Sequence, residues 1–323
     1  GRATTDYDNT LYFDSVIALK GNATISSNTA WTGNLTNADS LRRELIERGS
    51  IFQSSSDSEC IIHLMARSLQ RNIPERMEDA LRRVEGAFSI VAMTRSKLIG
   101  VRDPRGVRPL VLGKVGDGFA LSSETCALDI IGAEFVRDVA PGEMVVISNK
   151  GIESIFPFRS QNSKFCIFEH VYFSRPDSII HGQSVYETRR RIGVELAKES
   201  PIDADLVCPV PDSGTPAAIG FSQQSGIPYA MGIIRNQYMG RTFIEPTEQI
   251  RNMGVRLKLN VNRALIKGKR IILVDDSVVR GTTSRKIKEM IIDAGAKEVH
   301  FRIASPPTAW PCFYGVDTPQ REK

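Results

Sequence analysis

Residues 271–284 read IILVDDSVVRGTTS, and this stretch decides the fold. The apolar run Ile271–Val274 predicts a buried strand, and two acids follow at its carboxyl end. The next residues are rich in Gly and hydroxyl side chains and open a helical pattern, RKIKEMIIDAG. Backbone N–H groups and the helix dipole at such a turn bind phosphate. The Walker pattern GxxxxGK[ST] is absent from the stretch, so a different kind of phosphate-binding loop is predicted.

The paired acids, Asp275 and Asp276, are unexpected beside a phosphate, because carboxylates repel it. They fit if they face ribose hydroxyls, or a Mg²⁺ ion shared with a pyrophosphate. The alternative interpretation is that Asp-Asp-Ser only ends a strand and caps a turn.

Two further segments carry the same kind of chemistry. VCPVPDSGTPAAIG (207–220) places a small polar loop at another strand end, before a helix that begins near Pro216. IIRNQYMGRTFIEPTEQIR (233–251) mixes arginines and a tyrosine with Gly and Pro, and its simplest interpretation is a polar loop with a hairpin.

These segments resemble a known family. The 271–284 stretch is similar to the signature loop of phosphoribosyltransferases, and the 207–220 loop to their pyrophosphate loop. NQYMGRTFIEP, VDDSVVRGTTS, CIFEHVYFSRPDS and RIASPP together resemble the amidophosphoribosyltransferase family, over nearly the whole chain from about Gly33. The resemblance implies that Mg²⁺ is bound by Ser213, Asp275 and Asp276, and that residues 233–251 form a lid. It implies that phosphoribosyl pyrophosphate is bound by Asp212, Gly214, Arg235, Tyr238, Arg241, Arg280, Gly281, Thr282 and Thr283.

The front half is similar to an N-terminal-nucleophile glutaminase domain, on GNLTNADSLRREL, SSSDSE, GAFSIV and GVRDPRGVRPL. The resemblance implies that Gly33 forms the oxyanion hole and that Asp57 and Arg2 hold the glutamine. The family's oxyanion asparagine is replaced by Thr32, a shorter donor. The family's nucleophile is a Cys at the first mature residue, whereas the first Cys here is Cys60, which fits a buried core thiol. We therefore expect a chain truncated at both ends that does not hydrolyse glutamine as given but can use free ammonia.

The two parts of the chain have different patterns of strands and helices. Residues 1–158 combine hairpin-like strands with helical patterns at 37–47 and 58–70, which predicts an α+β glutaminase-like layered domain. Residues 159–323 alternate helices with fully apolar strands, which predicts an α/β phosphoribosyltransferase domain with a parallel sheet. Its expected strands are 204–211, 229–234, 270–277 and 298–305, and its expected helices are 185–199, 216–223 and 283–294.

Composition limits the remaining options. No run of about 18 apolar residues occurs, so no membrane span is expected. The formal net charge of +5 is spread along the chain, which does not favour nucleic-acid binding. The run Arg189-Arg190-Arg191 is interpreted as a solvated helix face or a subunit contact.

The five cysteines form no CxxC pair and fit reduced thiols. The family resemblance implies that Cys166 and Cys312 are two ligands of a [4Fe–4S] cluster, with the other two beyond Lys323. The alternative is two unrelated buried thiols. Cys126 and Cys208 are interpreted as core residues.

The resemblance implies a pentosyl transfer at the first step of de novo purine synthesis. Phosphoribosyl pyrophosphate and ammonia from glutamine would give 5-phosphoribosylamine, pyrophosphate and glutamate. It also implies purine nucleotides as feedback inhibitors, a homo-oligomer, and a location in the cytoplasm or the plastid stroma. Two alternatives remain: a regulator that senses phosphoribosyl pyrophosphate without catalysis, and a salvage enzyme that uses a nucleobase. The glutaminase-like front half disfavours the salvage enzyme, because a nucleobase acceptor needs no ammonia source.

Overall fold

The computed structural model describes residues 18–19, 28–159, 161–236, 258–278 and 281–314. The chain divides into two compact units. The N-terminal unit contains Gly1–Glu169, Asp177–Gly182 and Trp310–Glu322, and the C-terminal unit contains His170–Pro176 and Gln183–Ala309. In the part of the chain described, no helix has the length and apolar character needed to cross a membrane.

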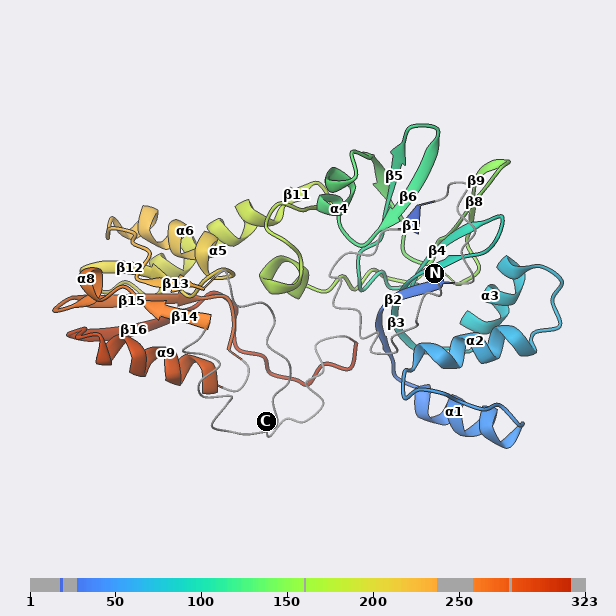
Figure 1. The fold of residues 1–323 in the computed structure, drawn as a ribbon, viewed down its shortest axis with the longest axis horizontal. Coiled ribbons are helices and arrows are strands. Elements are labelled where there is room, and N and C mark those ends of the chain that lie inside the picture. Colours follow the sequence, from blue (N-terminus) through green and yellow to red (C-terminus); the bar gives the residue numbers. More distant parts are fainter. Residues whose placement is uncertain (1–17, 20–27, 160, 237–257, 279–280, 315–323) are drawn as a thin grey trace. The chain divides into compact units, whose positions relative to one another are not determined.

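The N-terminal unit contains two antiparallel sheets (Figure 1). The larger sheet has the strand order β2 (Asn28–Leu35), β3 (Gly86–Met93), β4 (Leu98–Arg102), β8 (Met144–Ser148) and β9 (Gly151–Ile155). The smaller sheet has the order β1 (Ala18–Leu19), β6 (Gly118–Ser122), β5 (Val111–Val115) and β7 (Glu134–Asp138).

Side-chain alternation along β3 explains why these elements form layers. Ile90 packs in one core with residues of α1 (Ala38–Glu47), α2 (Ser58–Arg67) and α3 (Ile73–Leu81). Val91, on the opposite face, packs in a second core with Leu112 and Leu121 of the smaller sheet. Leu128 of α4 (Thr125–Ile130) joins a third core with Val111 and Ala120. The unit is therefore a layered α+β structure in the order helix, sheet, sheet, helix.

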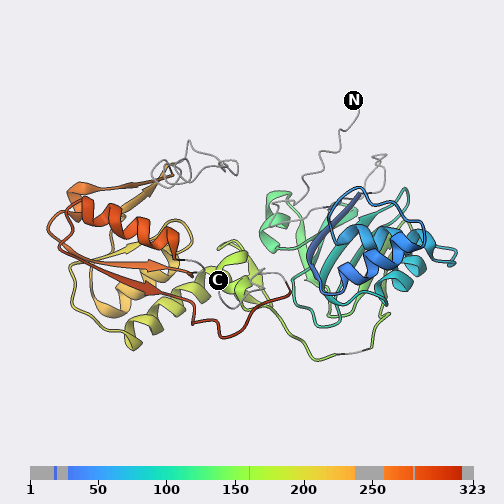
Figure 2. The same ribbon diagram turned by 90° about the horizontal axis from the view of Figure 1, so that it is seen from below.

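The C-terminal unit is built on a parallel sheet with the order β12 (Leu206–Pro209), β15 (Arg270–Asp275) and β16 (Glu298–Ile303). Ile272 and Val274 pack with residues of α5 (Val185–Glu199) and α6 (Thr215–Ser225), while Ile271 and Leu273 pack with α9 (Thr282–Asp293). Figures 1 and 2 show α5 and α6 on one face of this sheet and α9 on the other. Both faces are covered, which explains the unbroken apolar run.

One predicted strand is wrong in its extent and its pairing. The segment 229–234 does not form one parallel strand. Tyr229 makes an isolated parallel bridge with Val207, and β13 (Ile233–Arg235) pairs antiparallel with β14 (Leu259–Val261). The remaining elements are a π-helix (Glu169–Phe173), β10 (Ile179–Ile180), β11 (Gln183–Ser184) and α8 (Arg263–Ile266).

Helices α5 and α6 approach so closely that only glycine fits at the contact. A Cβ atom added at Gly193 would lie 1.9 Å from the Ala217 carbonyl oxygen, and one added at Gly220 would lie 1.9 Å from the Arg190 carbonyl oxygen. The backbones of the two helices therefore touch, and the position of one fixes the position of the other.

This contact gives a stability prediction. In an ordinary helix, Gly→Ala would stabilise by about 0.5–1 kcal/mol. Gly193→Ala should instead lower the free energy of unfolding by about 1–3 kcal/mol, because the helices must separate. Urea unfolding followed by circular dichroism measures the difference. Glu195→Ala, an exposed position of the same helix, is the control. A Gly193→Ala protein as stable as the wild type would contradict the close contact.

Candidate functional site

Two loops meet at the carboxyl edge of the parallel sheet. The Val210 N–H donates to the Val274 carbonyl at 2.8 Å, so the chain leaving β12 stays on β15. A Cβ atom added at Gly214 would lie 2.3 Å from the Val274 carbonyl oxygen and 3.2 Å from the Asp275 Cα atom. The Asp212–Gly214 loop is thus pressed against the start of the acidic pair. The peptide bond between Pro211 and Asp212 is cis.

The acidic pair is buried, and each carboxylate accepts a hydrogen bond from the residue that follows it. Asp275 is 9% exposed and Asp276 is 4% exposed. The Asp276 N–H donates to Asp275 Oδ1 at 2.9 Å, and the Ser277 hydroxyl donates to Asp276 Oδ1. Burial raises the pKa of Asp275 to about 7, and the neighbouring Asp276 carboxylate adds to the rise. Two carboxylates in this position favour a bound cation, because a cation relieves both the burial and the repulsion.

A buried arginine lies beside both loops, which the sequence analysis did not expect. Arg189 is 4% exposed, and its guanidinium donates to the carbonyl oxygens of His170 and Ser174, each at 2.7 Å. It lines a small cavity of about 10 Å³ together with Ser213 and Asp276. The prediction of a solvated face for the arginine run is therefore wrong for this residue.

Helical periodicity explains the difference within the run. The buried residues of α5 recur every fourth position: Val185, Arg189, Gly193 and Ala197. Arg190 and Arg191 fall outside this stripe and pair with the Glu187 carboxylate near the surface. The spacing itself was therefore a signal that could have placed Arg189 on the buried face.

The other predicted phosphoribosyl contacts are placed in part. Gly281 is the N-cap of α9 with φ of 68°, a left-handed conformation that favours glycine, and Thr282 and Thr283 begin the helix with exposed side chains. Arg235 forms an ion pair with Asp212. The predicted residues Arg2, Tyr238, Arg241 and Arg280 lie outside the described residues.

Two predicted glutamine contacts of the N-terminal unit, Gly33 and Asp57, lie near the end of β2. Gly33 has φ of 141°, and a Cβ atom there would lie 2.0 Å from the Ala87 carbonyl oxygen. Asp57 precedes α2, and its Oδ2 accepts the Leu35 N–H at 2.9 Å. Burial raises the pKa of Asp57, although this hydrogen bond opposes the rise. The Asp57 carboxylate therefore bonds β2 at Leu35, two residues beyond Gly33, the predicted oxyanion glycine.

Arg42 shapes the loop that leads to Asp57, a role that sequence analysis missed. Its guanidinium donates to the carbonyl oxygens of Ser54 and Ser56, each at 2.8 Å, and lies 4.1 Å from the centre of the Phe52 ring. Nothing in the sequence distinguishes this arginine from the neighbouring Arg43, because the bonds depend on where the loop returns to α1.

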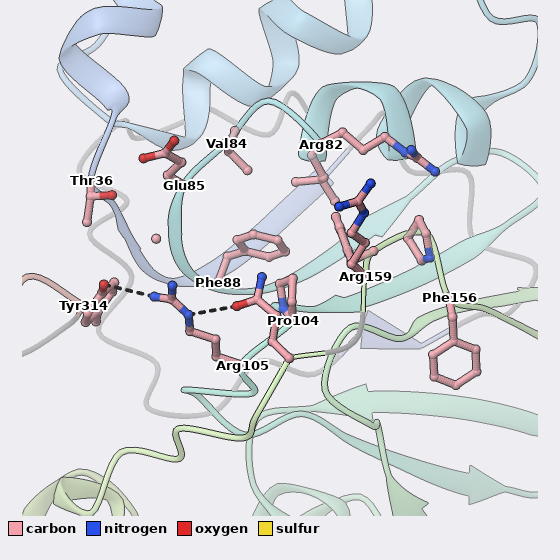
Figure 3. Close-up of a pocket in the computed structure, with 15 residues that line it drawn as sticks. Thr36, Arg82, Val84, Glu85, Phe88, Pro104, Arg105, Phe156, Arg159 and Tyr314 are labelled. Atoms are coloured by element: carbon pink, nitrogen blue, oxygen red, sulfur yellow. Dashed lines mark hydrogen bonds between the residues drawn. The ribbon is translucent and has the colours of Figure 1, made fainter.

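The N-terminal unit also contains a cavity of about 790 Å³ (Figure 3). Arg105 on its wall donates to the Tyr314 hydroxyl at 3.1 Å and to Gln161 Oε1 at 3.0 Å. Phe88 and Phe158 supply aromatic lining. Gly33 and Asp57 are not among the lining residues, although Gly33 packs against Phe88, which is one of them.

The two predicted cluster cysteines both lie in the N-terminal unit and are half-buried. Burial raises the pKa of the Cys166 thiol, and the nearby Cys312 adds a smaller contribution in the same direction. The residues that the structure describes contain no group of three or more His, Cys, Asp or Glu able to hold a metal ion. The prediction of core positions is confirmed for Cys60, Cys126 and Cys208, all of which are buried.

Comparison with known proteins gives consistent results. A profile of a glutamine amidotransferase domain matches residues 20–129. An amidophosphoribosyltransferase of Rhizobium etli is 56% identical over 299 residues, which is 91% of this chain and 60% of that protein. The amidophosphoribosyltransferase of Bacillus subtilis is 47% identical over 91% of this chain and 62% of its own length. The chain thus spans about three fifths of the length of these curated relatives.

Solved structures agree in fold. A glutamine phosphoribosylpyrophosphate amidotransferase from B. subtilis, complexed with ADP and GMP, superposes with a TM-score of 0.84 at 46% identity. The match covers 95% of this chain and 67% of that one. A structure described as the allosteric regulatory enzyme of purine biosynthesis gives a TM-score of 0.85 at 45% identity, over 95% of this chain and 66% of that one.

The raised pKa of Asp275 predicts a pH dependence of stability. The folded protein binds the Asp275 proton more tightly than the unfolded chain does, whose Asp has a pKa of about 4. This proton therefore stabilises the fold fully below about pH 4, and the stabilisation is lost as the pH rises through about 7. In metal-free buffer, Asp275→Asn should therefore gain about 1–3 kcal/mol of unfolding free energy relative to wild type between pH 5 and pH 8. Urea unfolding at each pH measures this gain.

The control for this measurement is Glu289→Gln, which replaces an exposed carboxyl on α9. Its difference from wild type should not change with pH. A constant difference for Asp275→Asn across the same range would show that the carboxyl titrates in the folded protein as it does in the unfolded chain.

Proposed function

The chain belongs to the amidophosphoribosyltransferase family, and we propose that it catalyses this family's transfer of ammonia to phosphoribosyl pyrophosphate. The products are 5-phosphoribosylamine and pyrophosphate, and in the complete reaction glutamine supplies the ammonia. One observation carries the proposal: the Asp212–Gly214 loop and the buried pair Asp275 and Asp276 meet at one edge of the parallel sheet. Ligands bind at this edge in open α/β sheets.

In this proposal each loop binds a different part of the substrate. The turn at Gly281 and the start of α9, with Thr282 and Thr283, hold the 5′-phosphate through N–H groups and hydroxyls. The Asp212–Gly214 loop faces the pyrophosphate with the backbone N–H groups that are not used within the protein; the Gly214 N–H is not among them, because it donates to the Val210 carbonyl at 3.0 Å. The finer assignment of a phosphoribosyltransferase fold, with residues 233–251 as its lid, belongs to the same proposal.

The donor set fits Mg²⁺. The carboxylates of Asp275 and Asp276 and the hydroxyl of Ser213 are hard oxygen ligands, and Mg²⁺ usually takes one or two protein carboxylates and completes its shell with water and substrate oxygens. That preference agrees with a described structure in which no third acidic side chain joins the pair. When bound, the ion neutralises charge on the leaving pyrophosphate.

The transfer step needs no covalent protein intermediate. The ammonia nitrogen forms a bond to the anomeric carbon while the carbon–oxygen bond to pyrophosphate breaks, and pyrophosphate leaves with the electron pair. The nitrogen then loses a proton to solvent. Arg235, exposed and paired with Asp212, can exchange that partner for the departing pyrophosphate.

The proposed part of the N-terminal unit is to bind glutamine, while the transfer step itself can proceed with free ammonia. Its proposed contacts are the Gly33 N–H in the oxyanion hole and Asp57 and Arg2 on the amino-acid end of glutamine. Cys60 does not attack glutamine in this scheme, because it is buried in the helical core and burial raises the pKa of its thiol. Purine nucleotides as inhibitors are part of the proposal, supported by the B. subtilis structure, which is complexed with ADP and GMP. A homo-oligomeric assembly is part of it on the family resemblance alone.

We also propose a [4Fe–4S] cluster. Such a cluster needs four thiolates, and Cys166 and Cys312 would provide two of them. Both cysteines lie in the N-terminal unit, which fits this role, and no third ligand stands with them among the described residues. The cluster would have a structural function here, joining residues far apart in the sequence.

The transfer proposal predicts that pyrophosphate release with ammonium chloride requires Mg²⁺ and the acidic pair. Replacing both Asp275 and Asp276 by Asn should lower kcat/KM by about 10²–10³-fold, because the charge that holds the metal is lost. A coupled pyrophosphate assay measures the rate, and Glu289→Gln is the control with wild-type activity. Equal rates in the double variant would exclude the mechanism. Substrate binding by the wild type without turnover at any ammonia concentration would indicate a sensor instead.

A further inference from the structure

The C-terminal unit buries an unusual set of charges. Among its described residues, the buried Arg, Lys, Asp and Glu side chains are Arg189, Asp275 and Asp276. Removing a charge from water costs several kcal/mol unless other groups compensate for it. One guanidinium and two carboxyl groups therefore lie buried in this unit, and both carboxyl groups belong to the proposed substrate site.

Arg189 lies where three segments of this unit converge. Its guanidinium bonds the carbonyl oxygens of His170 and Ser174, and so holds the turn at 170–174 against α5. The cavity of about 10 Å³ that it lines is also lined by Ser213 from the first loop and Asp276 from the second. Arg189 therefore lies beside both loops, on their buried side.

The position of the guanidinium is fixed by the helix that carries it. Arg189 and Gly193 lie one turn apart on the buried stripe of α5, and Gly193 touches the backbone of α6 at Ala217. Helix α6 begins at Thr215, directly after Ser213 and Gly214. A short rigid path thus connects the arginine to the loop that would face the pyrophosphate.

We propose that Arg189 is a positioning residue of the phosphoribosyl pyrophosphate site. It keeps Ser213 and Asp276 oriented toward the ligand, because it lines the same small cavity as both residues. The inference rests on the proposed function of this site. A lysine cannot replace the arginine fully, because one ammonium does not reproduce the planar fork that bonds two carbonyls at once.

A purely structural role would give a different result. If Arg189 only fastens the 170–174 turn to α5, its loss lowers stability but leaves substrate affinity unchanged in the folded protein. If it positions the site, its loss raises KM and the dissociation constant for the substrate while kcat changes little, because binding is lost equally from the ground state and the transition state.

The test compares Arg189→Met and Arg189→Lys with Arg191→Met, an exposed position of the same helix. Titration calorimetry with phosphoribosyl pyrophosphate and Mg²⁺ gives the dissociation constant, and ammonium-dependent turnover gives KM and kcat. We expect Arg189→Met to raise the dissociation constant and KM about tenfold or more, with kcat within about threefold of wild type. Arg189→Lys should fall between that variant and wild type, and Arg191→Met should match wild type.

The outcomes are distinguishable. Wild-type affinity in both Arg189 variants, with a lower unfolding midpoint, would overturn the positioning role. If Arg189→Met fails to fold, wild-type affinity in folded Arg189→Lys would do the same. A wild-type protein that binds the substrate without turnover still decides the role of Arg189 through calorimetry. A wild-type protein that neither binds nor turns over the substrate would reject the proposed function, and this inference with it.

Discussion

The parallel pairing of β12 with β15 is the constraint on which the C-terminal unit depends. Pro209 pairs with Val274, so both strands end at the same level and the chains leaving them are forced into contact. Gly214 then lies against the Val274 carbonyl oxygen, with no room for a side chain. The close approach brings a hydroxyl loop and two carboxylates to one edge, and phosphate chemistry becomes possible there because parallel strands present their carboxyl ends together.

This arrangement has a cost in stability that the rest of the unit offsets. Burial raises the pKa of Asp275, which means that its charged form is disfavoured in the folded protein. The offset comes from apolar packing on both faces of β15 and from the backbone contact between α5 and α6. Functional sites that need buried charge often lower the stability of the folded protein when no ligand is bound.

Local sequence patterns predicted an element correctly where its own residues determine its structure. Helix 185–199 was predicted with the observed bounds, and the apolar run 271–274 forms the middle of β15. The patterns failed where contacts with residues outside the local stretch determine pairing or burial. Residues 229–234 have the composition of a strand, but Tyr229 makes only an isolated parallel bridge, and 233–235 pair antiparallel with β14. Arg189 looked solvated because its neighbours in sequence are charged, whereas its burial follows from neighbours one turn away.

The sequence by itself determined the chemistry of this protein: the acids, hydroxyls and glycines of the two loops, and the family to which their order belongs. Short motifs carry that information because bonded neighbours are close regardless of the fold. Only the tertiary structure decided which distant residues act together. It placed Arg189 beside Ser213 and Asp276, and Arg42 on the loop that carries Asp57. The physical reason is that such contacts depend on how helices cross and where loops return, and no local pattern records either.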